Sequence, residues 1–174
     1  MDYIKRAKVG VMLGEHVNTD AIFPARYLVL FSPEEVKKHL FEDIDPTLSG
    51  RVRGMAVTGD ADFGCGSARE QGLTALKYGE VEMLVCKSFS RAFYRNGFNN
   101  AFPLFTADCP EPMAEIVSEG DELEANFTTG ELRNLTTNRA FRCSPTPEFL
   151  IALLREDGIW NMVNNHPELL EKRP

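Results

Sequence analysis

Residues 55–86 read MAVTGDADFGCGSAREQGLTALKYGEVEMLVC, and this stretch decides the fold of the chain. Residues 55–58 form a short apolar run typical of a buried strand, and residues 82–86 form a second one. Between them the sequence predicts a glycine-rich loop and then a helix over 68–78, which Gly79 ends. This strand–loop–helix–strand order is a βαβ unit, which favours a parallel sheet with a right-handed crossover.

The rest of the chain continues to alternate strand and helix patterns, without a linker, an internal repeat or a low-complexity stretch. Ser32-Pro33-Glu34-Glu35 favours a helix start, because the hydroxyl caps the first turn and the acids face the positive end of the helix dipole. The further predicted elements are a strand at 8–13, a helix from 33 to about 41, a helix at 90–96, a strand at 103–106, a β-hairpin at 123–137 and a last helix opened by Thr146-Pro147-Glu148. We therefore expect residues 1–174 to form a single α/β domain, a parallel-containing sheet with flanking helices and an added β-hairpin.

The composition is that of an ordinary globular protein, with 43% apolar and 26% charged residues. A formal net charge of -7 argues against nucleic acid as the main partner, because phosphate binding needs a basic stripe that the sequence lacks. The N-terminus, Met1-Asp2-Tyr3-Ile4-Lys5-Arg6, has no apolar run of signal-peptide length, and no later run is long enough to span a bilayer. We therefore expect a cytoplasmic protein with no membrane partner.

The four cysteines, Cys65, Cys86, Cys109 and Cys143, are too scattered for a C-x-x-C motif, and a cytosolic setting disfavours disulfides. A self-contained zinc or iron–sulfur site is therefore not expected. Cys86 lies within an apolar run and fits a small buried hydrophobe. Cys65 lies between two glycines and is a candidate nucleophile. The sequence places no histidine within ten residues of it to activate the thiol.

The glycine-rich loop matches neither of the familiar nucleotide-binding motifs. A Walker A loop needs Lys and then Ser or Thr after its last glycine, whereas Gly66 is followed by Ser67-Ala68. The dinucleotide fingerprint begins well with Gly64-Cys65-Gly66, but Arg69 occupies its third glycine position. A charged side chain there would block the close helix–strand packing that the third glycine permits.

The same loop has the features of a site for a small anion. Gly64 and Gly66 allow the backbone to approach a ligand, and Ser67 and Ala68 are expected at a helix N-terminus, where free N–H groups favour negative charge. Arg69 adds a planar fork suited to a carboxylate. A capping serine followed by a surface arginine would give the same pattern, so the residues alone leave both interpretations open.

The segment Asp62-Phe63-Gly64-Cys65-Gly66-Ser67-Ala68-Arg69-Glu70-Gln71 resembles the signature of the swivelling domain of the aconitase superfamily. Within that superfamily it is most similar to the small subunits of 3-isopropylmalate dehydratases and homoaconitases. The likeness continues, in order and at suitable spacing, through 87–91, 94–96, 18–20 with Pro24 and Tyr27-Leu28, 119–121 and 130–132. It spans nearly the whole chain and implies the swivelling β/β/α fold of that superfamily.

The resemblance implies a hydro-lyase that moves a hydroxyl group between adjacent carbons of a small di- or tricarboxylic hydroxy acid, by dehydration and rehydration. In the two-subunit enzymes a [4Fe-4S] cluster acts on the substrate hydroxyl and belongs to the large subunit. This chain would therefore hold no cofactor of its own and would be active only with that large subunit, in a heterodimer or heterotetramer.

Roles for individual residues also follow from the resemblance. Ser67 would be the general base, Arg69 would hold a substrate carboxylate beside the backbone of Gly66 and Ala68, and Asp20 would pair with a histidine of the large subunit. For Asp20 alone, a turn or a helix cap is an alternative. The chain departs from the family pattern at Ala68, where a second serine is usual, and at Gln71, where histidine is common. Both departures put the usual substrate pose in doubt.

Substrate choice in the family is associated with the segment that reads Tyr27-Leu28-Val29-Leu30 here. Homoaconitase-like relatives commonly have an arginine at the position of Val29, which pairs with a distal carboxylate. An aliphatic pair, Val29 and Leu30, suits an isopropyl group instead, because an unpaired buried carboxylate is costly. We expect interconversion of 2-isopropylmalate and 3-isopropylmalate, as in leucine biosynthesis. The alternatives are homocitrate, another alkylmalate such as dimethylmalate, a stand-alone carboxylate-binding module and a purely structural α/β domain.

Overall fold

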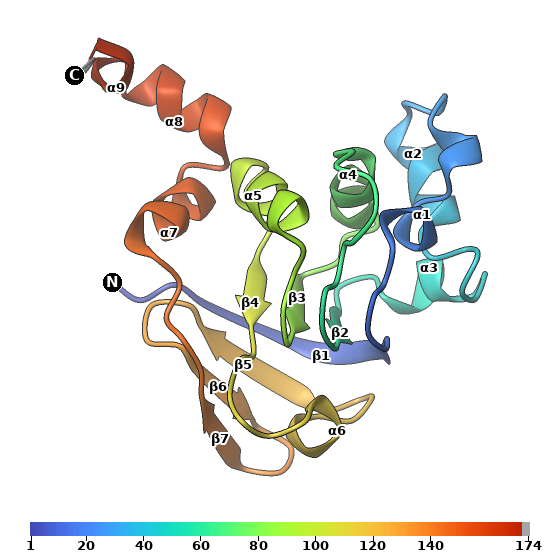
Figure 1. The fold of residues 1–174 in the computed structure, drawn as a ribbon, viewed down its shortest axis with the longest axis vertical. Helices are drawn as coiled ribbons and strands as arrows, with labels where there is room; N and C mark the ends of the chain where they lie inside the picture. The colour runs from blue at the N-terminus through green and yellow to red at the C-terminus, as the bar shows by residue number, and fades with distance from the viewer. Residues whose placement is uncertain (172–174) are drawn as a thin grey trace.

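The computed structural model describes residues 1–171, and within that range the strands form one seven-stranded mixed sheet (Figure 1). The strands run in the order β4-β3-β2-β1-β5-β6-β7. Their bounds are β1 Ile4–Met12, β2 Ala56–Gly59, β3 Met83–Cys86, β4 Leu104–Thr106, β5 Glu122–Asn126, β6 Glu131–Asn134 and β7 Arg139–Arg142. The expected α/β fold with a parallel-containing sheet is confirmed.

β1 joins the two halves of the sheet. Its first part pairs antiparallel with β5, from Ile4 opposite Asn126 to Lys8 opposite Glu122. Its second part pairs in parallel with β2, beginning with Val9 opposite Ala56, and the register shifts between Val9 and Val11. One nine-residue strand therefore carries both a parallel and an antiparallel neighbour. This explains why the added hairpin is continuous with the βαβ unit.

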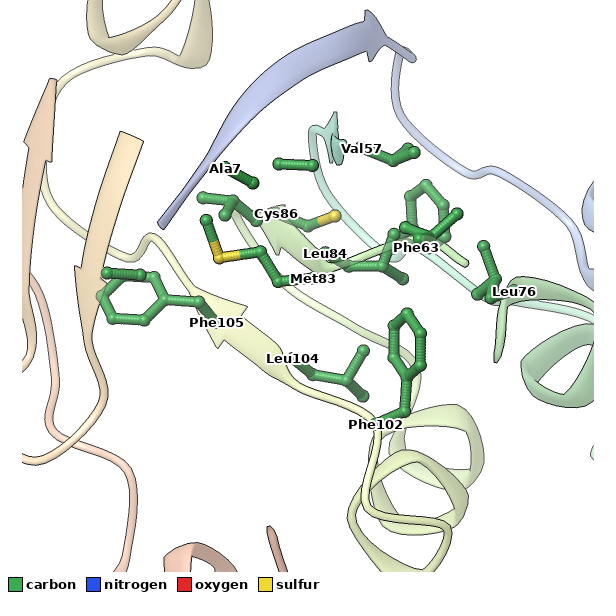
Figure 2. Packing of buried hydrophobic residues seen from close by; sticks show 14 of the residues in the cluster. Ala7, Val57, Phe63, Leu76, Met83, Leu84, Cys86, Phe102, Leu104 and Phe105 are labelled. Atoms are coloured by element: carbon green, nitrogen blue, oxygen red, sulfur yellow. The ribbon is translucent and has the colours of Figure 1, made fainter. Parts of the chain in front are cut away.

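The βαβ unit predicted from residues 55–86 is present. β2 and β3 pair in parallel, and every residue of both strands is buried, as apolar runs without alternation predict. Figure 2 shows Leu84 of β3 among Val57 of β2, Leu104 of β4 and Leu76 of the crossover helix. The sheet and its crossover helix therefore share one hydrophobic core.

Most helices lie beside the parallel half of the sheet, whereas α6 (Met113–Ile116) lies next to the antiparallel strands (Figure 1). Their bounds are α1 Thr19–Ile22, α2 Pro33–Val36, α3 Leu48–Arg51, α4 Gln71–Tyr78, α5 Arg91–Asn99, α6 Met113–Ile116, α7 Glu148–Arg155, α8 Ile159–Asn165 and α9 Glu168–Glu171, with 3-10 turns at Ala25–Tyr27 and Lys37–His39. In Figure 1, α4 and α5 lie side by side, with α1 to α3 beyond α4 and α7 beyond α5. None of the helices in the described range has the length and apolar character needed to span a bilayer.

Two predicted helices differ from the observed ones. The helix expected over 68–78 begins only at Gln71, because the preceding residues follow the glycine-rich loop rather than helical geometry. The Ser32 side chain makes no capping hydrogen bond, and α2 passes into a 3-10 turn that stops before Leu40. Phe41 then takes a positive φ of 59° and is fully buried, which turns the chain away from the helix axis.

The C-terminal third contains more structure than the sequence pattern indicates. The hairpin of β5 and β6 is confirmed, but β7 adds a third antiparallel strand to it. The helix predicted at Thr146-Pro147-Glu148 is α7. It is not the last helix, as predicted, because α8 follows it. Both additions are largely exposed, so neither has the apolar periodicity that reveals an element in a sequence.

We predict that Leu84→Ala lowers the free energy of unfolding by roughly 2–5 kcal/mol, because it leaves a cavity in the core around β3. Val29→Ala is the control, since its side chain is 75% exposed, and it should change stability by less than about 0.5 kcal/mol. Urea denaturation of both variants measures the difference. Equal losses of unfolding free energy in the two variants would contradict the position of Leu84 in the core.

Candidate active site

The glycine-rich loop is held on one side by the segment after β3. The Phe63 N–H donates to the Ser88 carbonyl at 3.0 Å, and the Ser90 N–H donates back to the Phe63 carbonyl at 2.9 Å. The Ser90 hydroxyl also donates to the Gly64 carbonyl at 2.6 Å. These bonds extend the parallel pairing of β2 and β3 beyond the ends of the strands, so the loop enters the site as extended backbone.

On its other side the loop pairs with the segment after β1. The Gly64 N–H donates to the Val17 carbonyl at 2.8 Å, and the Thr19 N–H donates to the Cys65 carbonyl at 2.9 Å. The Thr19 hydroxyl donates to the Ser67 carbonyl at 3.2 Å. The loop after β1 and the loop after β2 are therefore joined through their backbones, which brings Asp20 next to the glycine-rich loop.

Two glycines make this double pairing possible. Gly64 has φ +76°, and an added Cβ would overlap the ring of Phe93. Gly66 has φ +92°, and an added Cβ would lie 2.7 Å from the amide atoms of Asn18. Both positions combine a left-handed backbone with a close neighbour, a combination that only glycine accommodates without strain.

Three predicted site residues meet at the end of this loop. The Arg69 Nε donates to the Ser67 hydroxyl oxygen at 2.7 Å, and its Nη2 lies 3.4 Å from Asp20 Oδ1. The side chains of Arg69 and Asp20 are 39% and 53% exposed, so this ion pair lies at the surface. Asn18, not Asp20, caps α1, by accepting a hydrogen bond from the Asp20 N–H at 2.9 Å. The Asp20 carboxylate is thus free to face Arg69.

The expectation that Ser67 and Ala68 lie at a helix N-terminus is wrong. Helix α4 begins at Gln71 with Glu70 at its N-cap. The loop backbone before it is hydrogen-bonded to Thr19 as far as Ser67, so the helix starts only after that point. The alternative of a capping serine is excluded for the same reason. The positive charge next to the Ser67 hydroxyl comes from Arg69, and not from the amides of a first helical turn.

The Ala68 backbone is also fixed from the neighbouring helix, since its carbonyl accepts a hydrogen bond from Asn96 Nδ2 at 3.1 Å. Sequence reasoning did not assign a role to Asn96. It lies on α5, directly after the Tyr94-Arg95 pair, and no local pattern shows that its amide reaches the glycine-rich loop.

A groove of about 200 Å³ lies next to these residues. It is lined by Phe23, Leu28, Leu30, Phe31, Val36, Glu70, Gln71, Thr74 and Tyr78. A smaller hollow, of about 10 Å³, has Asp20 and Arg69 in its wall and shares Leu28 and Gln71 with the groove. A ligand held at Arg69 would therefore have an apolar wall of leucines close by.

The segment Tyr27-Leu28-Val29-Leu30 does not present all four side chains to this groove. Leu28 and Leu30 line it, whereas Val29 is 75% exposed and absent from its wall. The Tyr27 ring stacks on His39 at a centroid distance of 3.6 Å, and its hydroxyl donates to Glu42 at 2.8 Å. The apolar pair that faces the groove is therefore Leu28 and Leu30, instead of the expected Val29 and Leu30.

The cysteines do not form a metal cage. Burial raises the pKa of Cys86 well above its ordinary value and that of Cys143 to about 12. Cys65 is half-buried, and its thiol faces the carbonyl oxygen of His16 at 3.3 Å, while the His16 imidazole lies 3.4 Å from Asp62. Within residues 1–171, no group of three His, Cys, Asp or Glu side chains is placed to hold a metal. The residues that the structure describes therefore do not fit an iron–sulfur cluster.

Comparison with known proteins gives one consistent family. Residues 34–107 match the model of the aconitase C-terminal domain. The 3-isopropylmalate dehydratase small subunit of Clostridium acetobutylicum is 38% identical over 86% of this chain and 91% of its own length. The isopropylmalate/citramalate isomerase small subunit of Methanocaldococcus jannaschii is 42% identical, over 84% of this chain and 86% of its own length. A crystal structure of 3-isopropylmalate dehydratase from the same organism superposes with a TM-score of 0.85, at 28% identity, over 99% of this chain and 100% of that one.

We predict that Gly64→Ala destabilises the protein more than Gly120→Ala. Gly120 also has a positive φ, +88°, but no atom lies within 4 Å of an added Cβ, so its substitution costs only the backbone strain of about 1–2 kcal/mol. Gly64→Ala adds the overlap with Phe93, a further cost of about 1–3 kcal/mol. Chemical denaturation of the two variants tests this, and equal losses would contradict the packing of the loop on α5.

Proposed function

Because this chain belongs to the family of 3-isopropylmalate dehydratase small subunits, we propose that it is the small subunit of a hydro-lyase that interconverts 2-isopropylmalate and 3-isopropylmalate, a step of leucine biosynthesis. The observation that carries the proposal is the contact between Arg69 and Ser67, at 2.7 Å on an open surface beside an apolar groove. A fork for a carboxylate, a hydroxyl for proton transfer and an apolar wall are the groups that an alkylmalate requires.

The active enzyme contains a large subunit, and residues 1–174 act in it as one swivelling domain. Arg69 and Asp20 are exposed at the surface of this chain, so the site lacks the enclosure that excludes water during catalysis. The [4Fe-4S] cluster is assigned to the large subunit, as the family resemblance implies. The assembly is a heterodimer or a larger complex of the two subunits.

Ser67 takes the proton from the substrate carbon in dehydration and returns it in rehydration. A serine hydroxyl is a weak base, so its alkoxide form needs strong stabilisation. The Arg69 Nε already donates to the Ser67 oxygen, and this bond strengthens when the oxygen gains negative charge. The same guanidinium directs its remaining N–H groups to a substrate carboxylate. The Ala68 backbone, fixed by Asn96, keeps Ser67 and Arg69 on the same side of the loop.

Asp20 lies at the open end of the same cluster, 3.4 Å from Arg69. Its carboxylate limits how strongly Arg69 holds a substrate anion, because the two carboxylates compete for one guanidinium. A histidine from the large subunit that pairs with Asp20 relieves this competition, and Arg69 then becomes available to the substrate.

The alkyl group of the substrate lies against Leu28 and Leu30. A substrate with a distal carboxylate would place that charge against leucines without a basic partner in the groove wall, which is costly. Citramalate, with a methyl group in place of isopropyl, fits the same wall and is the second candidate. It is favoured by the name of the relative from Methanocaldococcus jannaschii, which includes both acids.

We predict that Ser67→Ala lowers kcat of the reconstituted complex by roughly 100-fold or more, because a positioned general base contributes about that much. Arg69→Lys should lower kcat/KM about 10- to 100-fold, since a lysine cannot bridge Ser67 and a carboxylate with one fork. Ser49→Ala, in the distant helix α3, is the control and should keep wild-type rates. Full activity with both Ser67→Ala and Arg69→Lys would contradict the site.

We also predict the order of substrates for the complex of this chain with its large subunit. 2-Isopropylmalate should exceed homocitrate in kcat/KM by roughly 100-fold or more, because a buried carboxylate without a partner costs several kcal/mol. Citramalate and 2,3-dimethylmalate should fall between them. Steady-state rates with the four acids measure this, and a preference for homocitrate would overturn the substrate assignment while leaving the family intact.

A further inference from the structure

The Glu42 carboxylate collects hydrogen bonds from three side chains. Its Oε1 accepts from the Tyr27 hydroxyl at 2.8 Å and from Arg26 Nη2 at 3.2 Å. Its Oε2 pairs with His39 Nδ1. Hydrogen bonds from His39, Tyr27 and Arg26 hold the pKa of the Glu42 carboxyl below its ordinary value. The carboxylate is therefore charged at neutral pH and shared among all three donors.

The donors also contact one another. The Tyr27 ring stacks on the His39 imidazole, with 15° between the two planes, and the Arg26 guanidinium lies 4.7 Å from the centre of the same ring. Arg26 makes two further hydrogen bonds, at 2.6 and 2.9 Å, to the Asp43 carboxylate. We call Arg26, Tyr27, His39, Glu42 and Asp43 the Glu42 cluster.

The Glu42 cluster joins two segments of the chain. Arg26 and Tyr27 belong to the segment that continues into Leu28 and Leu30, whereas the other three residues lie at 39–43. The second segment is anchored, because Phe41 is fully buried and its N–H donates to the Ile22 carbonyl at 2.8 Å.

The first segment has only local backbone support at this point. The Leu28 N–H donates to the Ala25 carbonyl at 3.2 Å, and the Leu30 N–H donates to the Tyr27 carbonyl at 2.9 Å. Its side chains divide between two directions, since Leu28, Leu30 and Phe31 line the groove while Val29 is exposed and absent from the groove wall. Which of these side chains face the groove depends on how the segment is turned, and the Glu42 cluster fixes the start of the segment at Arg26 and Tyr27.

We propose that Glu42 is a positioning residue: by holding Arg26 and Tyr27 against His39, it turns the following segment so that Leu28 and Leu30 form the apolar wall beside Arg69. This inference rests on the proposed function, because it assigns that wall to the alkyl group of the substrate. Glu42 itself does not line the groove and touches no reacting atom.

An isolated surface ion pair would not have this effect, because most such pairs contribute little to the stability of the folded conformation. The Glu42 cluster differs in three respects. The side chains of His39 and Glu42 are only 25% and 27% exposed, Arg26 binds Asp43 with two hydrogen bonds, and the Tyr27 ring contacts both the Arg26 guanidinium and the His39 imidazole. Shared networks of this kind hold a geometry more firmly than separate pairs.

The test compares Glu42→Ala and Glu42→Gln in the complex with the large subunit. Glu42→Ala should raise KM for 2-isopropylmalate about tenfold with kcat within about twofold, because the chemical groups stay in place while the wall is disordered. Glu42→Gln should recover much of this, since its amide oxygen still accepts from Tyr27 and Arg26. Glu80→Gln is the matched control, a surface carboxylate that pairs with Arg53 at 2.9 Å and does not line the groove.

Hydrogen–deuterium exchange of the full chain is the second measurement. Peptides that cover residues 25–31 should exchange faster in Glu42→Ala than in the wild type and in Glu80→Gln, while peptides from β2 and β3 should not change. An unchanged KM in Glu42→Ala overturns the inference, whether or not exchange increases. A wild-type complex that is inactive on all the alkylmalates would instead overturn the proposed function, and the inference with it.

Discussion

The site depends on one set of backbone hydrogen bonds, those that hold residues 63–65 between two neighbouring loops. The bonds to Ser88 and Ser90 continue the β2–β3 pairing, and the bonds to Val17 and Thr19 add the loop after β1. Three loops at one edge of the sheet thereby become a single hydrogen-bonded layer. This fixed backbone brings together the side chains of Ser67, Arg69 and Asp20 without the help of a ligand.

Much of the parallel half could be predicted, because its signals are local. Two apolar runs separated by a loop and a helix of suitable length admit few arrangements, and β2, α4 and β3 follow them. The hairpin of β5 and β6 has an equally local turn signal. The family resemblance assigned roles in one active site to Ser67, Arg69 and Asp20, which the residues alone did not establish, and the contact between Arg69 and Asp20 was not predicted. By contrast, the start of α4 at Gln71 depends on hydrogen bonds to a loop some fifty residues earlier, and no local propensity contains them.

The errors in the groove have the same origin. Val29 and Leu30 are adjacent in the sequence and similar in chemistry, so their different exposure follows only from how the segment is turned. That turn depends on Tyr27, whose partners His39 and Glu42 lie more than ten residues further along the chain. Charged residues in a sequence usually indicate a solvated face, and nothing in the pattern of residues 37–43 distinguishes Glu42 from its neighbours. Tertiary contacts of this kind become visible only when the chain is folded.

The divided pairing of β1 also sets the order in which the molecule can fold. β1, β2 and β3 meet through connections of moderate length, whereas Ile4–Lys8 must wait for β5, which lies more than a hundred residues later. During synthesis the first half of β1 is therefore an unpaired edge, available to other chains until the hairpin emerges. Its exposed face carries Arg6 and Lys8, charges of the kind that discourage edge-to-edge association. Late closure of a distant strand makes this topology a slow-folding one, with the parallel half able to collapse first.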